Sequence, residues 1–169
     1  MKVLITGRAG SGKSAVTAEL NRRGLFAVDT DKVEGLSSWQ DVATGELVTL
    51  ADNSYVDLVK YHWMWDAPTL SRLLASHEDI FVCGGAENDF DFEQQFDYHF
   101  VLDIEPGTQK QRLHDRTTNN YGKDPRMFDA IVEHQAVHVA KARELGLIVL
   151  DAEQSVGKVV DTILEAVGR

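Results

Sequence analysis

The sequence lacks the features of disulfide-stabilised, zinc-binding and membrane-spanning proteins. Cys83 is the only cysteine among 169 residues, which excludes a disulfide framework and a cysteine-based zinc site. No apolar run is long enough to cross a bilayer, and no charged-then-apolar leader opens the chain. Basic residues are also few: 17 Lys and Arg against 27 Asp and Glu give a net charge of −10, which argues against nucleic acid or an anionic membrane as the main partner. We expect a cytoplasmic protein that is a monomer or a homodimer.

The length indicates one folded unit. A chain of 169 residues can bury a sizeable core as a single domain, whereas two full domains would be cramped. No internal repeat or low-complexity tract appears. We therefore expect one α/β domain with an inserted subdomain.

A phosphate-binding loop stands near the start of the chain. Residues 7–14 read GRAGSGKS and lie between an apolar run, residues 3–5, and a segment of helical character, residues 15–23. Glycines let successive N–H groups point at one cluster of oxygens, and the following helix directs the positive end of its dipole to the same place. The alternative, a glycine-rich turn with an exposed lysine, leaves the spacing unexplained. The predicted nucleotide contacts here are Gly7, Ala9, Gly10, Ser11, Gly12, Lys13, Ser14 and Ala15.

Two carboxylates follow the second apolar run. Residues 25–28 are predicted to form a strand that ends in Asp29, Thr30 and Asp31. Side chains at positions i and i+2 of a strand point the same way, and open α/β sheets bind ligands at the carboxyl ends of their strands. Asp29 and Asp31 are therefore predicted to face a ligand. The alternative for either aspartate is to cap a following helix.

Residues 33–76 are the least regular part of the sequence. Glycines and a polar run at residues 52–54 interrupt them, and two helices are predicted at residues 55–65 and 68–76, divided at Pro68. This segment is the natural inserted, ligand-binding subdomain. Its tryptophans either fill a core or form a ligand platform. The side chains in question are Trp39, Trp63 and Trp65, with Asp66 beside them.

Two further strands are predicted at residues 79–83 and 99–103. Gly84 and Gly85 close the first, and glycines there let the backbone come close to a ligand. A helix that starts near Thr108 follows the second and carries Arg112 and Arg116, which share a helix face at i and i+4. The polar segment behind them is typical of a mobile segment that brings positive charge onto a phosphoryl group, although a solvated basic face is the alternative.

His134 and His138 lie at i and i+4 on a helix predicted over residues 128–144, a spacing that can make a metal pair. No third ligand with suitable spacing is evident. We therefore interpret both histidines as surface or core residues. A fifth strand at residues 147–150 and a final helix at residues 156–167, capped by Ser155, complete the prediction.

The order of elements is strand, phosphate loop, helix, strand with Asp-x-Asp, insert, strand with Gly-Gly, strand, arginine-bearing helix, strand, helix. It resembles the P-loop small-molecule kinases related to shikimate kinase, gluconate kinase and the adenylate kinase-like nucleoside monophosphate kinases. The resemblance implies an α/β fold of three layers, with a five-stranded parallel sheet and helices on both faces. It also implies a single kinase domain with a core of residues 1–32, 77–111 and 127–169, a helical acceptor-binding insert at about 33–76, and a lid at about 112–126.

The resemblance further implies roles for individual residues, with ATP and Mg²⁺ as cofactors. The loop residues look like the phosphate cradle, with Lys13 on the phosphates, and Ser14 and Asp29 look like the residues that serve the metal. Asp31 is similar to the carboxylate that takes the acceptor hydroxyl. The implied catalytic residues are Lys13, Asp31, Arg112 and Arg116, the last two as lid arginines. Asp151, Ala152 and Ser155 correspond to a loop against adenine, which Arg112 also approaches.

One departure from the family bears on the acceptor. Kinases of shikimate and of nucleoside monophosphates meet the charge of their acceptors with arginines, but no arginine occurs here between Arg23 and Arg72. Carboxylates and tryptophans occupy the same region, which favours an uncharged or cationic acceptor such as a nucleoside, a sugar or polyol, or an amino-alcohol. The predicted substrate contacts are Asp29, Asp31, Trp39, Trp63, Asp66, Gly84, Gly85, Glu87 and Arg126, and Asp89 adds negative charge.

Two alternatives stay open beside this reading. One is a nucleoside monophosphate kinase. The other is a P-loop ATPase or a nucleotide-binding module without a small-molecule acceptor. An ATPase usually has a metal-binding aspartate at the end of a later strand; here that strand ends in Cys83, Gly84 and Gly85, and Asp103 is only a partial substitute.

Overall fold

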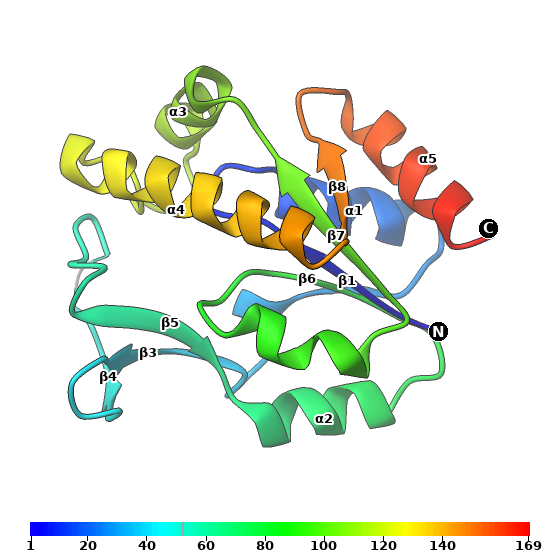
Figure 1. Cartoon of the computed structure of the whole chain (residues 1–169), viewed down its shortest axis with the longest axis horizontal. Coiled ribbons are helices and arrows are strands. Elements are labelled where there is room, and N and C mark those ends of the chain that lie inside the picture. The colour runs from blue at the N-terminus through cyan, green and yellow to red at the C-terminus, as the bar shows by residue number, and fades with distance from the viewer. Residues whose placement is uncertain (52) are drawn as a thin grey trace.

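A parallel sheet of five strands forms the middle layer of the molecule (Figure 1). The computed structural model describes residues 1–51 and 53–169. In the order β2-β6-β1-β7-β8, Leu4 of β1 pairs with Val82 on one side and His99 on the other. The five-stranded parallel sheet predicted from the sequence is confirmed. Its strands are β1 (Lys2–Thr6), β2 (Ala27–Asp29), β6 (Ile80–Cys83), β7 (Tyr98–Asp103) and β8 (Ile148–Asp151).

Helices cover both faces of this sheet. Val3 and Ile5 pack in one core with residues of α1 (Lys13–Arg22) and α5 (Val156–Ala166), whereas Leu4 packs in a second core with α2 (Ala67–Ala75). All three side chains are fully buried. A strand with helices on both faces needs apolar residues at every position, which explains the unbroken apolar run of β1.

The insert differs from the prediction. Residues 61–65 form a strand, β5 (Tyr61–Trp65), in an antiparallel sheet with β3 (Ser37–Asp41) and β4 (Leu47–Val48), so the predicted helix at residues 55–65 is wrong. Aromatic residues favour strands because their side chains pack across a pleated surface, as Trp63 does opposite Trp39. The second predicted helix is present as α2, with Pro68 in its first turn. The predicted polar run includes Asp52, which lies outside the described residues.

Two helices enclose the predicted lid. α3 (Pro106–Asp115) begins two positions before Thr108, because proline is well suited to a first helical turn. Arg116 caps its C-terminus in an extended conformation, so the two arginines do not share a helix face as predicted. Residues 116–124 then lead to α4 (Pro125–Glu144), and Asp124 accepts a hydrogen bond from the backbone N–H of Arg126 at the start of that helix.

Short helical turns complete the fold. The loop after β2 is a 3-10 turn, Thr30–Lys32, and a second 3-10 segment, Asp89–Gln95, lies between β6 and β7. Ser155 stands at the N-cap of α5, but its side chain makes no capping hydrogen bond among the described residues.

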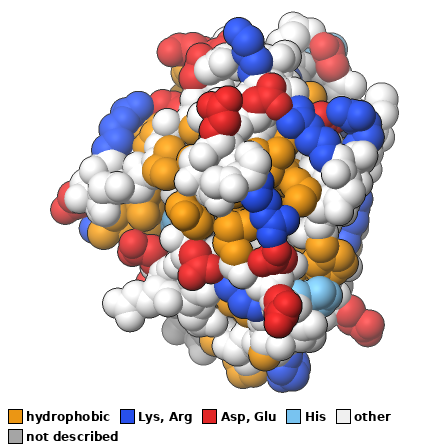
Figure 2. All heavy atoms as spheres, turned by 90° about the vertical axis from the view of Figure 1, so that its right-hand side faces the viewer, with side chains coloured by type: hydrophobic (Ala, Val, Ile, Leu, Met, Phe, Trp, Pro, Cys, Tyr) orange, Lys and Arg blue, Asp and Glu red, His pale blue; other side chains and the backbone are white. Residues whose placement is uncertain are grey.

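The two ends of the chain lie on one side of the molecule, where the amino group of Met1 and the side chain of Arg169 both pair with Asp79 (Figure 1). On this side acidic and basic side chains are interspersed with apolar ones (Figure 2). Within the described part of the chain, none of the helices combines the length and the apolar character that a membrane span requires.

Candidate active site

A cavity of about 420 Å³ opens where β1, β2 and β6 end. The phosphate loop forms one wall, and the insert, the segment between α3 and α4, and α4 itself supply the others. From the phosphate loop and the first turn of α1 the lining residues are Gly7, Arg8, Ala9, Gly10, Gly12, Lys13, Ser14 and Ala15.

The phosphate loop has the backbone that an anion site requires. Gly10 and Gly12 have φ values of 86° and 104°, which glycine adopts without steric cost. Among the described residues no side chain caps α1, and the backbone N–H groups of Ala15 and Val16 donate to the carbonyl oxygen of Gly12 at 3.0 Å, which leaves those of Lys13 and Ser14 as the first-turn donors for an anion. The ammonium of Lys13 donates to the carbonyl oxygens of Gly7 and Arg8, at 2.7 and 3.1 Å. Burial lowers the pKa of Lys13, although Asp31 and other carboxylates oppose this shift, so an anion that binds beside the ammonium stabilises its charged form.

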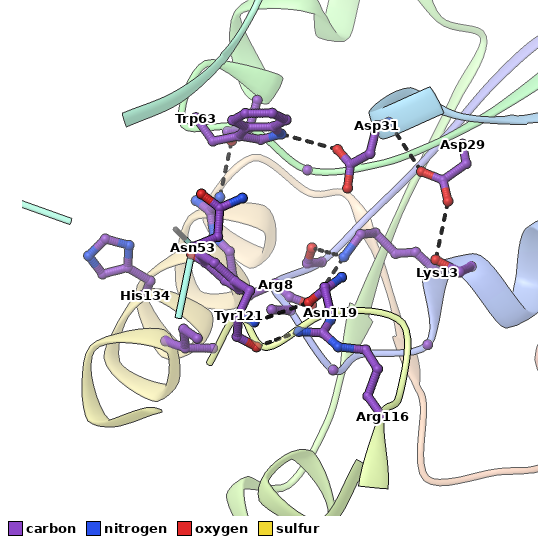
Figure 3. Close-up of a pocket in the computed structure, with 18 of the residues that line it drawn as sticks. Arg8, Lys13, Asp29, Asp31, Asn53, Trp63, Arg116, Asn119, Tyr121 and His134 are labelled. Atoms are coloured by element: carbon purple, nitrogen blue, oxygen red, sulfur yellow. Dashed lines mark hydrogen bonds between the residues drawn. The ribbon is translucent and has the colours of Figure 1, made fainter. Parts of the chain in front are cut away.

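Asp29 and Asp31 both line the cavity (Figure 3). They do not share one strand as predicted, because β2 ends at Asp29 and Asp31 lies in the 3-10 turn that follows. Asp29 ends β2, and one oxygen of its carboxylate, Oδ1, accepts from the backbone N–H of Asp31 at 3.2 Å. Its other oxygen accepts from the hydroxyl of Ser14 at 3.3 Å. Asp29 therefore both caps the following turn and lines the cavity, two roles that the sequence left as alternatives.

Asp31 lies against an aromatic wall. Its Oδ1 accepts a hydrogen bond from the indole Nε1 of Trp63 at 3.1 Å (Figure 3). Burial raises the pKa of Asp31, because the opposing effects of Lys13 and of this hydrogen bond are smaller. The carboxylate is thus a stronger base than an exposed aspartate.

Trp39 and Trp63 combine the two roles that the sequence left open: they pack in a core and they line a cavity. Their rings lie 5.1 Å apart between centroids, and the ring of Tyr121 lies 6.1 Å from that of Trp39. Trp39 is buried in a small core with α4, yet both tryptophans and Tyr121 line the cavity.

The two glycines after β6 have different roles. A Cβ atom on Gly84 would lie 1.9 Å from the Thr30 hydroxyl oxygen, so this glycine packs against the loop after β2 and does not line the cavity. A Cβ atom on Gly85 would lie 2.8 Å from the carbonyl oxygen of Gly7, so this residue lets the two loops meet, and it does line the cavity. The close packing on Thr30 explains why Gly84 needs to be a glycine without a ligand, and its predicted ligand contact stays a prediction.

Arg112 connects the phosphate loop to the loop after β8. Its guanidinium donates to the carbonyl oxygens of Ser11 and Ala152, at 3.4 and 2.9 Å. Arg116 donates to the carbonyl oxygen of Tyr121, and both arginines line the cavity. Both predicted lid arginines therefore reach the cavity, and each is held there by contacts with different backbone carbonyl groups.

A protein-family model described as an AAA domain matches residues 3–138. The chain belongs to this family. The match runs from β1 and the phosphate loop through Asp29 and Asp31 to α4. No curated protein sequence matches the chain.

Solved structures share the fold of this AAA domain. Shikimate kinase from Acinetobacter baumannii in complex with shikimate has a TM-score of 0.65 at 14% identity, over 98% of this chain and 92% of that chain. Deoxyadenosine kinase from M. mycoides with bound dATP has 0.60 at 16%, over 100% of both chains. A gluconokinase from Sinorhizobium meliloti 1021 has 0.56 at 16%, over 99% and 91%. At these identities the structural similarity shows the fold alone. The fold is the one that the order of elements predicted.

A second cavity of the AAA domain, about 240 Å³, adjoins the phosphate loop. Ala152 lines it, as does Gln154, which the sequence did not single out. Asp151 and Ser155 do not: Asp151 is exposed and accepts from the backbone N–H of Glu153, and Ser155 is exposed at the start of α5. The loop turns both side chains to solvent, and a contact of these two residues with the nucleotide stays a prediction.

Three charged residues predicted at the ligand site lie elsewhere. Asp66 caps α2 and accepts from the N–H and the hydroxyl of Thr69, at 2.9 and 2.6 Å. Arg126 pairs with Asp124 at 2.8 Å in solvent. Asp89 is fully buried and contacts His138 at 3.0 Å. None of the three lines the cavity in this structure, so the ligand contacts of Asp66 and Arg126 stay predictions. The charge of Asp89 still acts on Lys13, whose pKa it raises.

Several lining residues escaped the prediction. Arg8 stands at a position where the phosphate-loop motif allows any residue, and the sequence indicates only a surface or core role for His134. The others come from loops and from α4, where only the packing of distant segments brings a side chain to the cavity. They are Asn53, Leu58, Ala86, Asn119, Tyr121 and Ile131.

The oxygen atoms at the first cavity suit a magnesium ion. The described residues hold no group of three or more His, Cys, Asp or Glu side chains arranged for a metal. Ser14 and Asp29 instead offer two neighbouring oxygens, and Mg²⁺ commonly takes one or two protein oxygens together with water and phosphate oxygens.

Proposed function

We propose that this AAA domain is an ATP-dependent phosphotransferase that moves the γ-phosphoryl group to a hydroxyl of a small neutral or cationic molecule. One observation supports this most directly: a single cavity is lined both by the phosphate loop and by Asp31, a carboxylate held in hydrogen-bond geometry. The similar structures add weight, since their names describe kinases of shikimate, deoxyadenosine and gluconate.

In this proposal the loop amides and Lys13 hold the triphosphate. Ser14 and Asp29 would hold Mg²⁺, which supplies positive charge between the phosphates. Arg112 and Arg116 stabilise the charge on the phosphoryl group during transfer, as cations beside a phosphate loop do in phosphoryl-transfer enzymes.

Asp31 orients the acceptor hydroxyl and takes its proton. Trp63 holds Oδ1, which leaves Oδ2 as the proton-accepting atom. As the hydroxyl oxygen bonds to the γ-phosphorus, the bond from that phosphorus to the β-γ bridging oxygen breaks and ADP leaves. A base with a raised pKa is better matched to this step near neutral pH.

A nucleoside monophosphate is the second candidate acceptor, and Arg8 favours it. The argument from missing arginines counted only the insert, whereas the phosphate loop itself delivers a guanidinium to the cavity. An anionic acceptor would find Arg8 and Arg116 there, but Glu87 lies 3.4 Å from Arg8 and offsets its charge, so this acceptor ranks second.

The domain limits also stay a proposal: a single domain with a core of residues 1–32, 77–111 and 127–169, an insert at about 33–76 and a lid at about 112–126. We further propose that the protein is cytoplasmic and acts as a monomer or a homodimer.

The test is ATP consumption with Mg²⁺, measured alone and with a panel of nucleosides, polyols, amino-alcohols and nucleoside monophosphates. Stimulation by an acceptor, together with its phosphorylated product, supports the kinase. Constant hydrolysis supports an ATPase instead, and no consumption supports a binding module. Lys13→Ala serves as the inactive control in every arm.

A further inference from the structure

Three charged or titratable side chains from separate elements meet in the cavity, at the end of Trp63 opposite Asp31. Arg8 comes from the phosphate loop, Glu87 from the loop after β6 and His134 from α4, and all three line the cavity. Arg8 Nη2 lies 3.4 Å from Glu87 Oε2, and His134 Nδ1 lies 3.5 Å from Glu87 Oε1. We call these residues the Arg8–Glu87–His134 triad.

Backbone contacts fix the triad in place. The N–H of Arg8 donates to the side chain of Gln135 at 3.0 Å, and its Nη1 donates to the carbonyl oxygen of Ala86 at 3.1 Å. The N–H of Glu87 donates to the carbonyl oxygen of Trp63 at 2.8 Å. The triad is therefore held between the phosphate loop, α4 and the aromatic wall.

Trp63 spans the distance between the triad and Asp31. Its backbone contacts Glu87, and its indole Nε1 contacts Asp31. Figure 3 shows Asp31 and His134 on opposite sides of this ring, with Arg8 below it. A molecule that lies along the indole with a hydroxyl at Asp31 therefore directs its other end to the triad.

The triad has free capacity for hydrogen bonds of both kinds. Both of its internal contacts are near the outer limit of hydrogen-bond length. The guanidinium of Arg8 has five N–H groups; its Nε–H is buried, and its contacts with Ala86 and Glu87 use two of the other four. Glu87 can accept further bonds, because an ionised carboxylate has about four acceptor positions.

The charges of the triad balance. Burial raises the pKa of Glu87, but the contact with His134 and the charges of Arg8, His134 and His62 outweigh it and lower the pKa to about 2. Glu87 is therefore ionised beside the positive Arg8. The positive charge of Arg8 and the negative charge of Glu87, 3.4 Å apart, offset each other.

We propose, resting on the kinase proposal, that the Arg8–Glu87–His134 triad binds the end of the acceptor remote from the reacting hydroxyl and selects a neutral group that both donates and accepts hydrogen bonds. A carboxamide, a vicinal diol and the edge of a heterocycle share this chemistry. An ammonium would be repelled by Arg8 and a carboxylate by Glu87, so charged ends are disfavoured. The aromatic wall of Trp39, Trp63 and Tyr121 packs against a ring between the two ends.

The experiment compares ring alcohols that differ only at one end. Glucuronamide, glucuronate and 6-amino-6-deoxyglucose form one series, and shikimic acid with its carboxamide and aminomethyl counterparts forms another. Binding to the full chain with a non-hydrolysable ATP analogue and Mg²⁺ is measured by calorimetry, and transfer from ATP is measured in parallel. We expect the carboxamide to bind about 10-fold more tightly than either charged partner in at least one series.

Two variants should move this preference in opposite directions. Glu87→Gln leaves Arg8 unbalanced and should raise the relative affinity for the carboxylate about 10-fold, whereas Arg8→Gln should do the same for the ammonium. The exposed Glu165→Gln on α5 is the matched control and should change nothing. If Arg8→Gln fails to fold, Glu87→Gln alone tests the charge balance.

The inference is overturned if the wild type binds no carboxamide more tightly than both charged partners, or if a folded Glu87→Gln variant keeps the wild-type order. These outcomes are separate from the fate of the kinase proposal. Phosphoryl transfer without the expected preference rules out the proposed role of the triad but is consistent with the kinase proposal. The expected preference and its switch in binding, without any transfer, support the triad as a ligand site and remove the kinase.

Discussion

The two ends of the main cavity are built in different ways. The end that we propose for the phosphates is one continuous stretch rich in glycine, whereas the end that we propose for the acceptor collects side chains from β3, β5, the loop after β6, the segment between α3 and α4, and α4. Backbone groups recognise what all nucleoside triphosphates share, and side chains recognise what distinguishes one acceptor from another. Changes at the phosphate end should therefore abolish all nucleotide chemistry, and changes at the acceptor end should affect transfer or selectivity alone.

The largest expected effect is at the phosphate end. Lys13→Ala removes the ammonium that the Gly7 and Arg8 carbonyls position, and we expect turnover to fall by about 10³-fold or more. ADP release under saturating ATP measures it. Lys158→Ala, an exposed change on α5, is the matched control. Turnover within a few fold of the wild type would mean that the loop does not hold a reacting phosphate.

The next effect separates the two ends. Asp31→Asn keeps an oxygen for the indole of Trp63 but removes the base, so we expect transfer to fall ~10²- to 10³-fold while the affinity for ATP stays unchanged. Because burial raises the pKa of Asp31, transfer by the wild type should decline on acidification at a pH above 3.8. That decline should be missing from the residual activity of the variant. A parallel loss of ATP binding would instead assign Asp31 to the phosphate end.

A third prediction concerns the wall behind the phosphate loop. His99 is buried and lies 2.9 Å from the hydroxyl of Thr6, the last residue of β1. Burial lowers the pKa of His99 to about 4 from 6.5, so between these values the unfolded chain takes up a proton that the native chain does not. The stability that the neutral His99 contributes should be fully present above pH 6.5. The free energy of unfolding should fall by roughly 3 kcal/mol when the pH is lowered to 4.

Urea unfolding at a series of pH values measures this loss. His99→Gln keeps a polar atom near Thr6 and should flatten the dependence in that window, whereas His114→Gln, at an exposed position, should not. An unchanged slope in His99→Gln would show that other groups cause the acid sensitivity.

The smallest expected effect tests whether Arg126 belongs to the acceptor end of the cavity. Arg126→Gln loses a solvent-exposed pair with Asp124 and a contact over the ring of Tyr55, so we expect stability to change by about 0.5 kcal/mol or less. Transfer should stay within about 2-fold, because Arg126 does not line the cavity. Thermal unfolding and acceptor kinetics measure both. A large rise in the acceptor KM would return this arginine to the site.

Local sequence predicted some parts of this protein well and others badly. The five strands of the parallel sheet follow from apolar runs and the phosphate loop follows from the spacing of glycines, and these elements lie close to where the sequence predicts them. The segment at residues 55–65 was assigned to a helix because its pairing partner, β3, lies some twenty residues earlier along the chain, so only the antiparallel pairing of Trp39 with Trp63 makes it a strand. Asp66 and Arg126 illustrate the same limit: a capping bond and an ion pair, neither visible in the spacing, turn them from the cavity.

The sequence by itself determined the phosphate end, because the conformation of a glycine-rich loop and the direction of the following helix depend on neighbouring residues. Only the tertiary structure decided the acceptor end. Arg8, Glu87 and His134 are separated by up to 126 positions, and nothing but the packing of α4 and of the loop after β6 against the phosphate loop brings their charges within reach of one another.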